Sequence, residues 1–237
     1  MDARALITQA RRAGRASLDE SSGKRLLAAF GVAVPQSIVV QPDEALDAKL
    51  AALAPPFVVK VMSAHILHKS DVGGVRVGLQ NAAEVRAAIE SMRGKPAIAM
   101  HALDGFLVEE MAPAGQELVI GGLKDPQFGP LVMVGLGGIF VEVLRDVAFR
   151  ICPIERIDAL EMLDELKGKA VLDGVRGQRP VSIEAIADVL LRIGGAQGLL
   201  VTLAAEIEEA DLNPVICSEH GAVAVDARFI LTDRAAP

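Results

Sequence analysis

The sequence predicts an α/β (α+β) protein built as two lobes, and three observations support this fold class. Helical and strand patterns alternate over roughly the first hundred residues, which is typical of a small α/β lobe. A strand-rich stretch with turn residues follows, and two amphipathic helices and a closing pair of strands come after it. The chain of 237 residues also exceeds one domain of ~100–200 residues, so two lobes fit its length.

Two capping patterns mark helices in the first half of the chain. Ser17 with Glu20 forms a capping-box pattern, and Asn81 with Glu84 forms another. Gly31 is expected to end the first of these helices, because glycine readily adopts the left-handed conformation that follows a helix. The expected elements, in order, are a helical arm over 3–14, a helix over 17–30, a strand ending at 40, a helix over 43–53, strands over 57–61 and 75–79, and a helix over 82–94.

The second half of the chain begins with a strand over 106–111, where the chain is expected to cross into the second lobe. Further strands are expected over 118–123, 130–134 and 148–151, helices over 155–167 and 182–193, and two closing strands over 211–216 and 222–231. These elements divide the chain into an N-terminal helical arm over 1–21, a small lobe over 22–107 and a large lobe over 108–237.

Composition and charge exclude several classes of protein. The net charge is −7 and aromatic residues make up only 3%, without Trp or Tyr, which argues against nucleic-acid binding by base stacking. The uncharged stretch over 126–141 is interrupted by glycines and is too short to span a membrane. The N-terminus lacks the apolar segment of a signal peptide, so we expect a cytoplasmic protein. Cys152 and Cys217 are then expected to be reduced thiols.

Three charged residues occur in otherwise apolar strands. Lys60 must either reach solvent at a sheet edge or point into a cleft, since burying an unpaired ammonium is costly. Glu109 and Glu110 end the strand over 106–111, and one of two adjacent strand residues always faces outward. For all three residues, an exposed structural position and a binding site both remain open.

Two segments combine residues that suit phosphate chemistry. Gly135-Leu136-Gly137-Gly138 follows a strand, where glycine would let backbone N–H groups approach phosphate oxygens, although tight packing explains it equally well. His68-Lys69-Ser70-Asp71 lies between apolar strands, three residues after His65. His68 could accept a phosphoryl group as a nucleophile while Lys69 offsets the developing charge, or the segment could be an ordinary solvated loop.

Oxygen-bearing side chains gather near the end of the chain. Asp211 and Asn213 lie two residues apart on one expected strand, and Asp226 lies on its partner strand. Hard oxygen ligands that converge in this way suit Mg²⁺ bound together with nucleotide phosphates. The alternative is a turn at Asn213-Pro214 beside a charged strand edge.

Together these strings resemble, in the same order, the ATP-grasp subunit of ADP-forming acyl-CoA synthetases, which are relatives of succinyl-CoA synthetase. The resemblance covers about 22–231, and its most specific strings are HKSDVGGV over 68–75 and GGIFVE over 137–142. The other matching strings are Phe57-Val58-Val59-Lys60, Val108-Glu109-Glu110-Met111, Lys124-Asp125-Pro126-Gln127-Phe128-Gly129-Pro130, Asp211-Leu212-Asn213-Pro214 and Asp226-Ala227-Arg228.

The resemblance implies an ATP-grasp fold whose two lobes clamp a nucleotide, and the reaction acyl-CoA + ADP + phosphate ⇌ carboxylic acid + CoA + ATP. The chain would be an acid–thiol ligase of the ADP-forming acetate–CoA ligase type. No Rossmann-type CoA-binding half is visible in the residues, so the resemblance implies the separate β subunit, active only with a CoA-binding α subunit in a hetero-oligomer such as α2β2. Mg²⁺ and ATP or ADP are its expected ligands, whereas nucleic acid and membranes are not expected partners.

The resemblance also implies a role for each candidate residue. Lys60 would contact nucleotide phosphates, and His68 matches a histidine that relays phosphate between subunits. The remaining assignments are Lys69, Gly137 and Gly138 to the nucleotide phosphates, Glu109 and the backbone near Met111 to adenine, Glu117 to ribose, Asn213 and Asp226 to magnesium, and Asp211 to a place beside the phosphoryl path, as ligand or orienting group.

Two other functions stay open on the residues. One is a stand-alone ATP-grasp ligase that activates a carboxylate for an amine, although such ligases usually carry an additional substrate-binding domain that 237 residues hardly accommodate. The other is a nucleotide-binding module without catalysis. The joint presence of Lys60, His68, Asn213 and Asp226 favours an enzyme over such a module.

Overall fold

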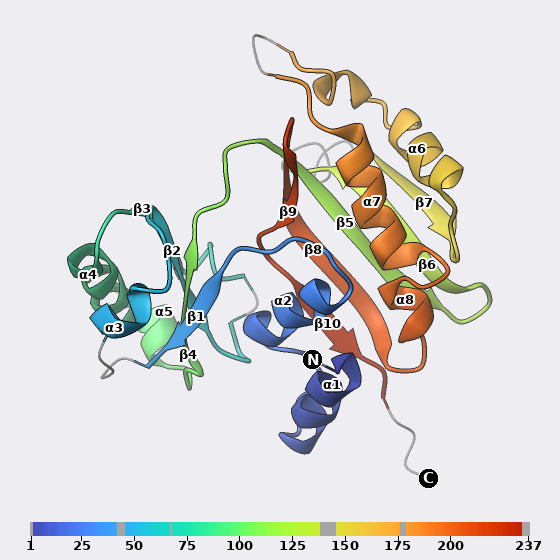
Figure 1. Ribbon diagram of the computed structural model, residues 1–237. Helices are drawn as coiled ribbons and strands as arrows, with labels where there is room; N and C mark the ends of the chain where they lie inside the picture. The colour runs from blue at the N-terminus through green and yellow to red at the C-terminus, as the bar shows by residue number, and fades with distance from the viewer. Residues whose placement is uncertain (1, 42–45, 67, 138–145, 176–178, 234–237) are drawn as a thin grey trace. The chain divides into compact units, whose positions relative to one another are not determined.

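The computed structural model describes residues 2–41, 46–66, 68–137, 146–175 and 179–233. The chain forms two compact units, a larger one over 1–34 and 113–237 and a smaller one over 35–112 (Figure 1). Both are α/β units, each with its own sheet, which confirms the predicted fold class. In the described parts of the chain, no helix has the length and apolar character needed to cross a membrane.

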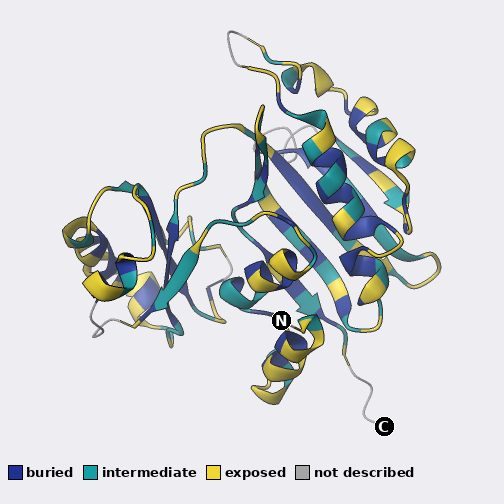
Figure 2. Cartoon of the chain, in the orientation of Figure 1, coloured by how far each residue is buried: buried dark blue, intermediate teal, exposed yellow. Residues whose placement is uncertain are grey.

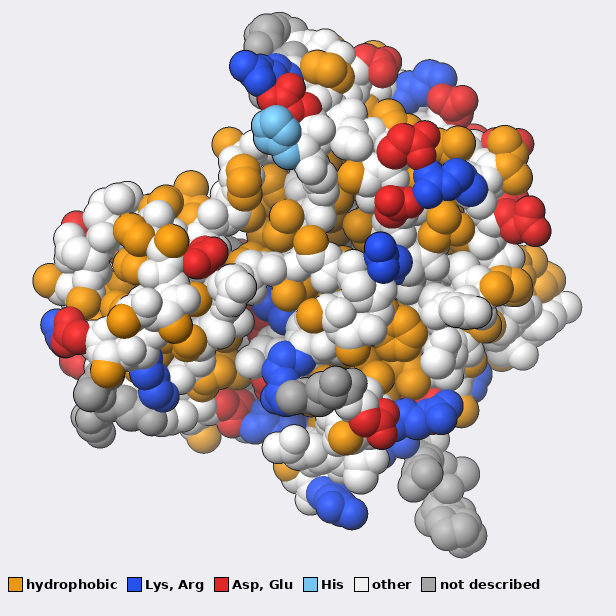
Figure 3. Space-filling model, in the orientation of Figure 1, with side chains coloured by type: hydrophobic (Ala, Val, Ile, Leu, Met, Phe, Trp, Pro, Cys, Tyr) orange, Lys and Arg blue, Asp and Glu red, His pale blue; other side chains and the backbone are white. Residues whose placement is uncertain are grey.

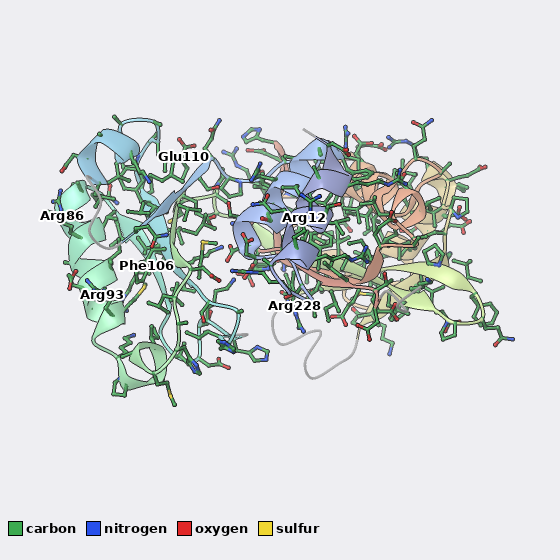
Figure 4. The ribbon with its side chains drawn as sticks, turned by 90° about the horizontal axis from the view of Figure 1, so that it is seen from below. Arg12, Arg86, Arg93, Phe106, Glu110 and Arg228 are labelled. Carbon is green, nitrogen blue, oxygen red and sulfur yellow. The ribbon has the colours of Figure 1, made fainter. Side chains whose placement is uncertain are left out.

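The smaller unit is a four-stranded antiparallel sheet with helices packed against it. Its strands run in the order β1-β4-β2-β3, and α4 contacts both β2 and β3. Phe106 is fully buried in its core together with Val59, Ile89 and Met92; Figure 4 labels it, along with Arg86 and Arg93 of α4. The elements are β1 (Ser37–Val40), α3 (Leu46–Leu50), β2 (Phe57–Met62), β3 (Val75–Leu79), α4 (Ala82–Arg93), α5 (Pro96–Ala99) and β4 (Gly105–Glu110).

The larger unit is built on a six-stranded antiparallel sheet. Its main path is β10-β8-β5-β6-β7, and β9 pairs with β8. The elements are α1 (Ala3–Arg12), α2 (Glu20–Ala29), β5 (Gln116–Asp125), β6 (Gly129–Leu136), β7 (Val147–Ile151), α6 (Arg156–Asp164), the 3-10 helix η2 (Lys169–Val171), α7 (Ile183–Gly194), α8 (Leu199–Thr202), β8 (Ile207–Ser218), β9 (Gly221–Ala224) and β10 (Arg228–Leu231).

Helices cover one face of this larger sheet. In Figure 1, α7 and α8 lie in front of it, where both contact β6, while α6 contacts β7. Figure 2 shows the resulting core in dark blue, which includes Val132, Val134, Ile186 and Leu190. The outer surfaces of these helices carry mixed charges in Figure 3. Arg156 of α6 forms ion pairs with Glu184 and Asp188 of α7.

The start of α2 differs from the predicted capping box. Asp19, not Ser17, is the N-cap, and its carboxylate accepts a hydrogen bond from the Ser22 backbone N–H at 2.9 Å. Ser17 instead forms a β-bridge with Ile230. Ser17 and Glu20 have the residue types and spacing of a capping box. The β-bridge with Ile230, however, holds Ser17 in an extended conformation outside the helix. Gly31, with φ +78°, follows the helix as predicted.

The units also divide the chain differently from the expected lobes. Residues 22–34, expected in the small lobe, belong to the larger unit, and the chain crosses back at 112/113 rather than 107/108. The reason is packing, because Leu26, Leu27 and Val32 are buried in the core of the larger unit. The expected closing strand over 222–231 is also divided into β9 and β10.

The two cysteines are free thiols in the core of the larger unit. Both are buried, and burial raises the pKa of Cys152 to about 11 and that of Cys217 to about 12. Thiolates are the reactive form of cysteine, so these residues have the character of core side chains, as the sequence indicated.

Candidate functional site

Lys60 and Glu109 form a buried ion pair in the smaller unit. The Lys60 Nζ lies 2.8 Å from the Glu109 Oε1, and the two residues are only 6% and 1% exposed. β2 is an inner strand between β4 and β3, and Glu109 is the pairing partner of Val58, two residues before Lys60 on the same face. Both structural alternatives for these residues, an edge position for Lys60 and a solvated face for Glu109, are therefore excluded.

Glu110 and Met111 continue the chain out of this strand. The Glu110 carboxylate accepts a hydrogen bond from the Ala54 backbone N–H at 2.8 Å, so it fixes the start of the segment before β2. The Met111 N–H donates to the Pro56 carbonyl oxygen at 2.8 Å, and its side chain is 42% exposed. This segment therefore has a fixed backbone and an exposed apolar side chain. Both features suit a surface against which a flat aromatic base could pack.

The segment that follows β2 holds His68 in an exposed position and Lys69 in a half-buried one. Two backbone hydrogen bonds close the loop, from Gly74 to Lys69 at 2.6 Å and from Gly73 to Ser70 at 2.9 Å. Gly74 also accepts from the Val61 N–H at 2.8 Å, which ties the loop to the strand that carries Lys60. The loop is therefore a fixed turn with an exposed imidazole at its beginning.

Lys95 contacts this loop, and the sequence did not indicate it as a candidate site residue. Its ammonium donates a hydrogen bond to the Gly73 carbonyl at 2.7 Å. Gly73 has φ +64°, a conformation that favours glycine, and a Cβ there would displace the Lys95 Nζ, which lies 2.0 Å from its position. Lys95 stands outside every motif, 22 residues further on. Only the packing of the loop against the end of α4 reveals it.

In the larger unit, a β-bulge in β8 shapes the segment with Asp211 and Asn213. One residue lies between Leu118 and Ile120 on β5, but two lie between their partners Leu212 and Val215 on β8. Asp211 and Asn213 alternate with the buried Leu212, so they lie on the face of β8 that turns away from the core. Asn213 is exposed and Asp211 half-buried.

Asp226 lies in the segment between β9 and β10, alongside this bulge. β8 pairs with β9 up to Val215 and with β10 from Asp211, so the segment with Asp226 runs past Asn213. The Asp226 Oδ1 accepts a hydrogen bond from the Ala227 N–H at 2.8 Å, which fixes its side chain. The structure thus supplies carboxylate and amide oxygens of the kind that Mg²⁺ takes, usually together with waters and phosphates. Among the described residues, no cluster of three or more His, Cys, Asp or Glu side chains could hold a metal by itself.

Electrostatics at this location favour a bound cation. Burial raises the pKa of Asp211, and the carboxylates of Glu209 and Asp226 raise it further, while Arg228 acts in the opposite direction. Negative charge is therefore held together on this part of the sheet at an energetic cost. A divalent cation would relieve that repulsion, so the donor set and its charge both fit Mg²⁺.

The glycine string after β6 has a packing role in its described part. Gly135 and Leu136 belong to β6, and the Gly137 N–H donates to the Glu117 carbonyl at 2.8 Å. A Cβ on Gly137 would lie 2.8 Å from that same oxygen, so the close approach of the two strands requires glycine. Glu117 itself is exposed on β5. Gly138 lies outside the described residues, and the phosphate role of the string stays a prediction.

We expect Asp211→Asn to stabilise the nucleotide-free protein at neutral pH. An acid whose pKa is raised in the folded state destabilises that state once it is ionised, so the gain should be complete above the raised pKa. It should disappear as the pH falls toward the ordinary Asp value of about 3.9. Thermal unfolding in EDTA from pH 4 to 8 measures this, with the exposed Asp173→Asn as control. An equal or lower stability of Asp211→Asn at pH 7 would contradict the argument.

Comparisons with known proteins identify the family of the chain. A family model described as an ATP-grasp domain matches residues 9–231. The β subunit of acetate–CoA ligase (ADP-forming) I from Pyrococcus furiosus is 41% identical over 231 residues, which cover 97% of each chain. Acetate–CoA ligase (ADP-forming) I from Archaeoglobus fulgidus is 42% identical over 89% of this chain, but the match covers only 30% of that relative.

A solved structure extends the comparison to the fold. It is acetyl-coenzyme A synthetase 1 from Ca. Korarchaeum cryptofilum, in complex with coenzyme A and Mg-AMPPCP, with its phosphohistidine segment pointing towards the nucleotide-binding site. It matches with a TM-score of 0.84 and 42% identity, over 98% of this chain and 100% of that one. The chain therefore belongs to the ATP-grasp family, within the group of β subunits of ADP-forming acetate–CoA ligases.

Proposed function

We propose that this chain transfers a phosphoryl group between a phosphohistidine and ADP in the reaction acyl-CoA + ADP + phosphate ⇌ carboxylic acid + CoA + ATP. The observation that carries the proposal is the buried Lys60–Glu109 pair beside the His68 loop. A lysine that is buried on an inner strand is costly to keep and needs a reason. Phosphoryl transfer supplies one, because it depends on fixed positive charge and on positioning.

We propose these roles for the residues on the nucleotide side. Lys60 contacts the nucleotide phosphates, and Glu109 holds its ammonium in place. The backbone near Met111 binds adenine, and Glu117 binds the ribose hydroxyls. Support comes from the rigid backbone after β4 and from the exposure of Met111 and Glu117. Lys69 and the glycine string with Gly137 and Gly138 complete the phosphate contacts.

Asn213 and Asp226 are the proposed magnesium ligands, and Asp211 orients or supplements them. Asn213 and Asp226 would hold Mg²⁺, which would supply positive charge to neutralise the nucleotide phosphates. The protein's own part is to hold one oxygen donor, Asn213, in the β8 bulge and the other, Asp226, in the segment that runs past it. The hydrogen bond from the Ala227 N–H to Asp226 supports this assignment, since it fixes one donor before the metal arrives.

His68 is proposed as the phosphoryl relay. In the direction of ATP formation, a ring nitrogen of His68 attacks the phosphorus of a phosphohistidine on the partner chain, and the old N–P bond breaks as the new one forms. A β-phosphate oxygen of ADP then attacks the same phosphorus, the N–P bond to His68 breaks, and ATP forms. The exposure of the imidazole on a fixed loop supports this role.

The partner is proposed to be a CoA-binding α subunit, and the complex a cytoplasmic hetero-oligomer such as α2β2. Two findings support this. The matching chain from P. furiosus is itself a subunit, whereas the A. fulgidus relative extends well beyond the matched part. The acid substrate would then bind mainly in the partner.

The proposal is tested by mixing the purified chain with the CoA-binding chain of the same organism. We expect calorimetry to show Mg·ADP binding by this chain alone, and acyl-CoA formation only in the mixture. Acyl-CoA formation by this chain alone would contradict the two-subunit assignment. Absence of any Mg·ADP or Mg·ATP binding would favour a non-catalytic module.

A further inference from the structure

The larger sheet has an apolar face opposite its helices. Leu123 of β5, Leu131 and Met133 of β6, and Phe149 and Ile151 of β7 form what we call the apolar sheet face. The strand register places Leu123, Leu131 and Ile151 in one cross-strand row and Met133 and Phe149 in the next. Residues that are directly paired share a face of the sheet, so these five side chains form one continuous surface.

Exposure distinguishes this face from the opposite one. Leu123, Phe149 and Ile151 are 41%, 48% and 54% exposed, and Leu131 and Met133 are half-buried. Val132 and Val134, which alternate with Leu131 and Met133, and Ala148, which precedes Phe149, are buried. Arg150 points to the helix side as well, where its guanidinium contacts Glu165 of the segment after α6. In Figure 1 the helices lie in front of the sheet, so the apolar sheet face is the far side of β6 and β7.

The hairpin between β5 and β6 extends this surface. Asp125 accepts hydrogen bonds from the Gln127 and Phe128 backbone N–H groups at 2.7 and 2.8 Å, which fixes the turn. Phe128 at its end is 55% exposed. This turn lies in the string over 124–130 that resembles the family, yet the proposed nucleotide site uses none of it. A rigid turn that presents an aromatic side chain is typical of an interface anchor.

The same face leads to the proposed magnesium residues. Phe149 pairs with Met133, Met133 with Gly121, and Gly121 with Asp211. Three strand spacings of about 4.8 Å put Phe149 roughly 14 Å from Asp211 along one row of the sheet. A protein seated on the apolar sheet face would therefore lie beside the residues proposed to bind the metal.

We infer that the apolar sheet face, with Phe128, is the docking surface for the CoA-binding partner chain. This inference rests on the proposed function. The phosphoryl group that the partner delivers ends on the nucleotide, so the partner must reach the nucleotide site, and this apolar surface borders Asp211 beside the proposed magnesium ligands. In the relative whose match covers 30% of its length, the rest of the polypeptide must also find a surface to pack on. A second copy of this chain has no need to lie beside the nucleotide.

The test compares a double variant on the apolar sheet face with a control variant on the helix side of the sheet, at an isoleucine of similar exposure. Ile151→Thr, combined with Phe149→Thr, removes apolar surface from the docking face and leaves a residue that favours strands at both positions. Ile157→Thr, at 59% exposure on α6, is the matched control on the helix side. Affinity of each full-length protein for the CoA-binding chain is measured by calorimetry, together with Mg·ADP affinity and the thermal midpoint.

We expect the double variant to bind the partner at least tenfold more weakly, and the control to bind as the wild type does. Mg·ADP affinity should be unchanged in both. Unchanged partner binding by the double variant would overturn the inference while leaving the proposed function intact. A wild-type protein that sediments as a dimer without the partner, and a double variant that sediments as a monomer, would also overturn it, because the surface would then join two copies of this chain. A wild-type chain that fails to bind the partner would refute the proposed function itself.

Discussion

Replacing Lys60 by methionine is expected to lower the free energy of unfolding by about 3 kcal/mol and to abolish measurable Mg·ADP binding. The change removes the ammonium that lies 2.8 Å from the Glu109 carboxylate, in a place where both residues are almost completely buried. Burial of a charge that has lost its nearest opposite charge is strongly unfavourable. Urea denaturation measures the first effect, and calorimetry measures the second.

A second substitution separates stability from function. The double variant Lys60→Met with Glu109→Gln removes both charges, so most of the lost stability should return, while Mg·ADP binding should not. Lys169→Met is the matched control, since Lys169 pairs with Asp164 at 3.0 Å but both side chains are more than half exposed. It should change stability by less than about 1 kcal/mol. A Lys60→Met protein that binds Mg·ADP normally would rule out the proposed phosphate contact.

The substitution His68→Asn should lower turnover of the complex by about 100-fold or more, in the range seen for loss of a catalytic side chain. The imidazole is exposed at the start of a loop that backbone hydrogen bonds hold, so the fold and the Mg·ADP affinity should not change. After incubation of the complex with labelled ATP, the two chains are separated by electrophoresis. The wild-type chain should carry an acid-labile label, and the His68→Asn chain should carry none.

His65 is the natural control for this experiment. It is also exposed, lies three residues earlier, and stacks against His101 with ring centroids 5.8 Å apart. His65→Asn should keep both the label and the turnover. Normal labelling and turnover of the His68→Asn protein would remove the relay from the mechanism, although the ATP-grasp assignment would stand, because it does not depend on His68.

Some elements could be predicted closely because their signals are local. β2, β3 and β7 match the apolar strand patterns within one residue, and the helix α4 begins after Asn81, whose side chain accepts a hydrogen bond from the Glu84 N–H. Side-chain alternation and capping act over a few residues, so they can be read without knowing what lies elsewhere in the chain. The predicted N-cap of α2 was wrong, because Ser17 forms a β-bridge with Ile230, more than two hundred residues away.

In the candidate site too, residue types could be predicted from local sequence, whereas burial and long-range contacts could not. The types of residue at 60, 68, 109, 211, 213 and 226 indicated phosphate and magnesium chemistry, and the order of the strings identified the family. The sequence left open whether Lys60 lies at an edge or inside, because burial depends on which strands become its neighbours. It also contained no signal for Lys95, whose contact with Gly73 arises only when α4 packs on the sheet.

The sequence by itself determined the fold class, the family and the chemical type of each candidate residue, since these depend on local patterns and on ordered motifs. Only the tertiary structure decided the ion pair of Lys60 with Glu109, the β8 bulge beside Asp226, the placement of α2 in the larger unit and the apolar sheet face. Each of these depends on strand order and register, which bring together residues far apart in the chain. Pairing across a sheet is a property of the whole fold, and no local stretch of sequence encodes it.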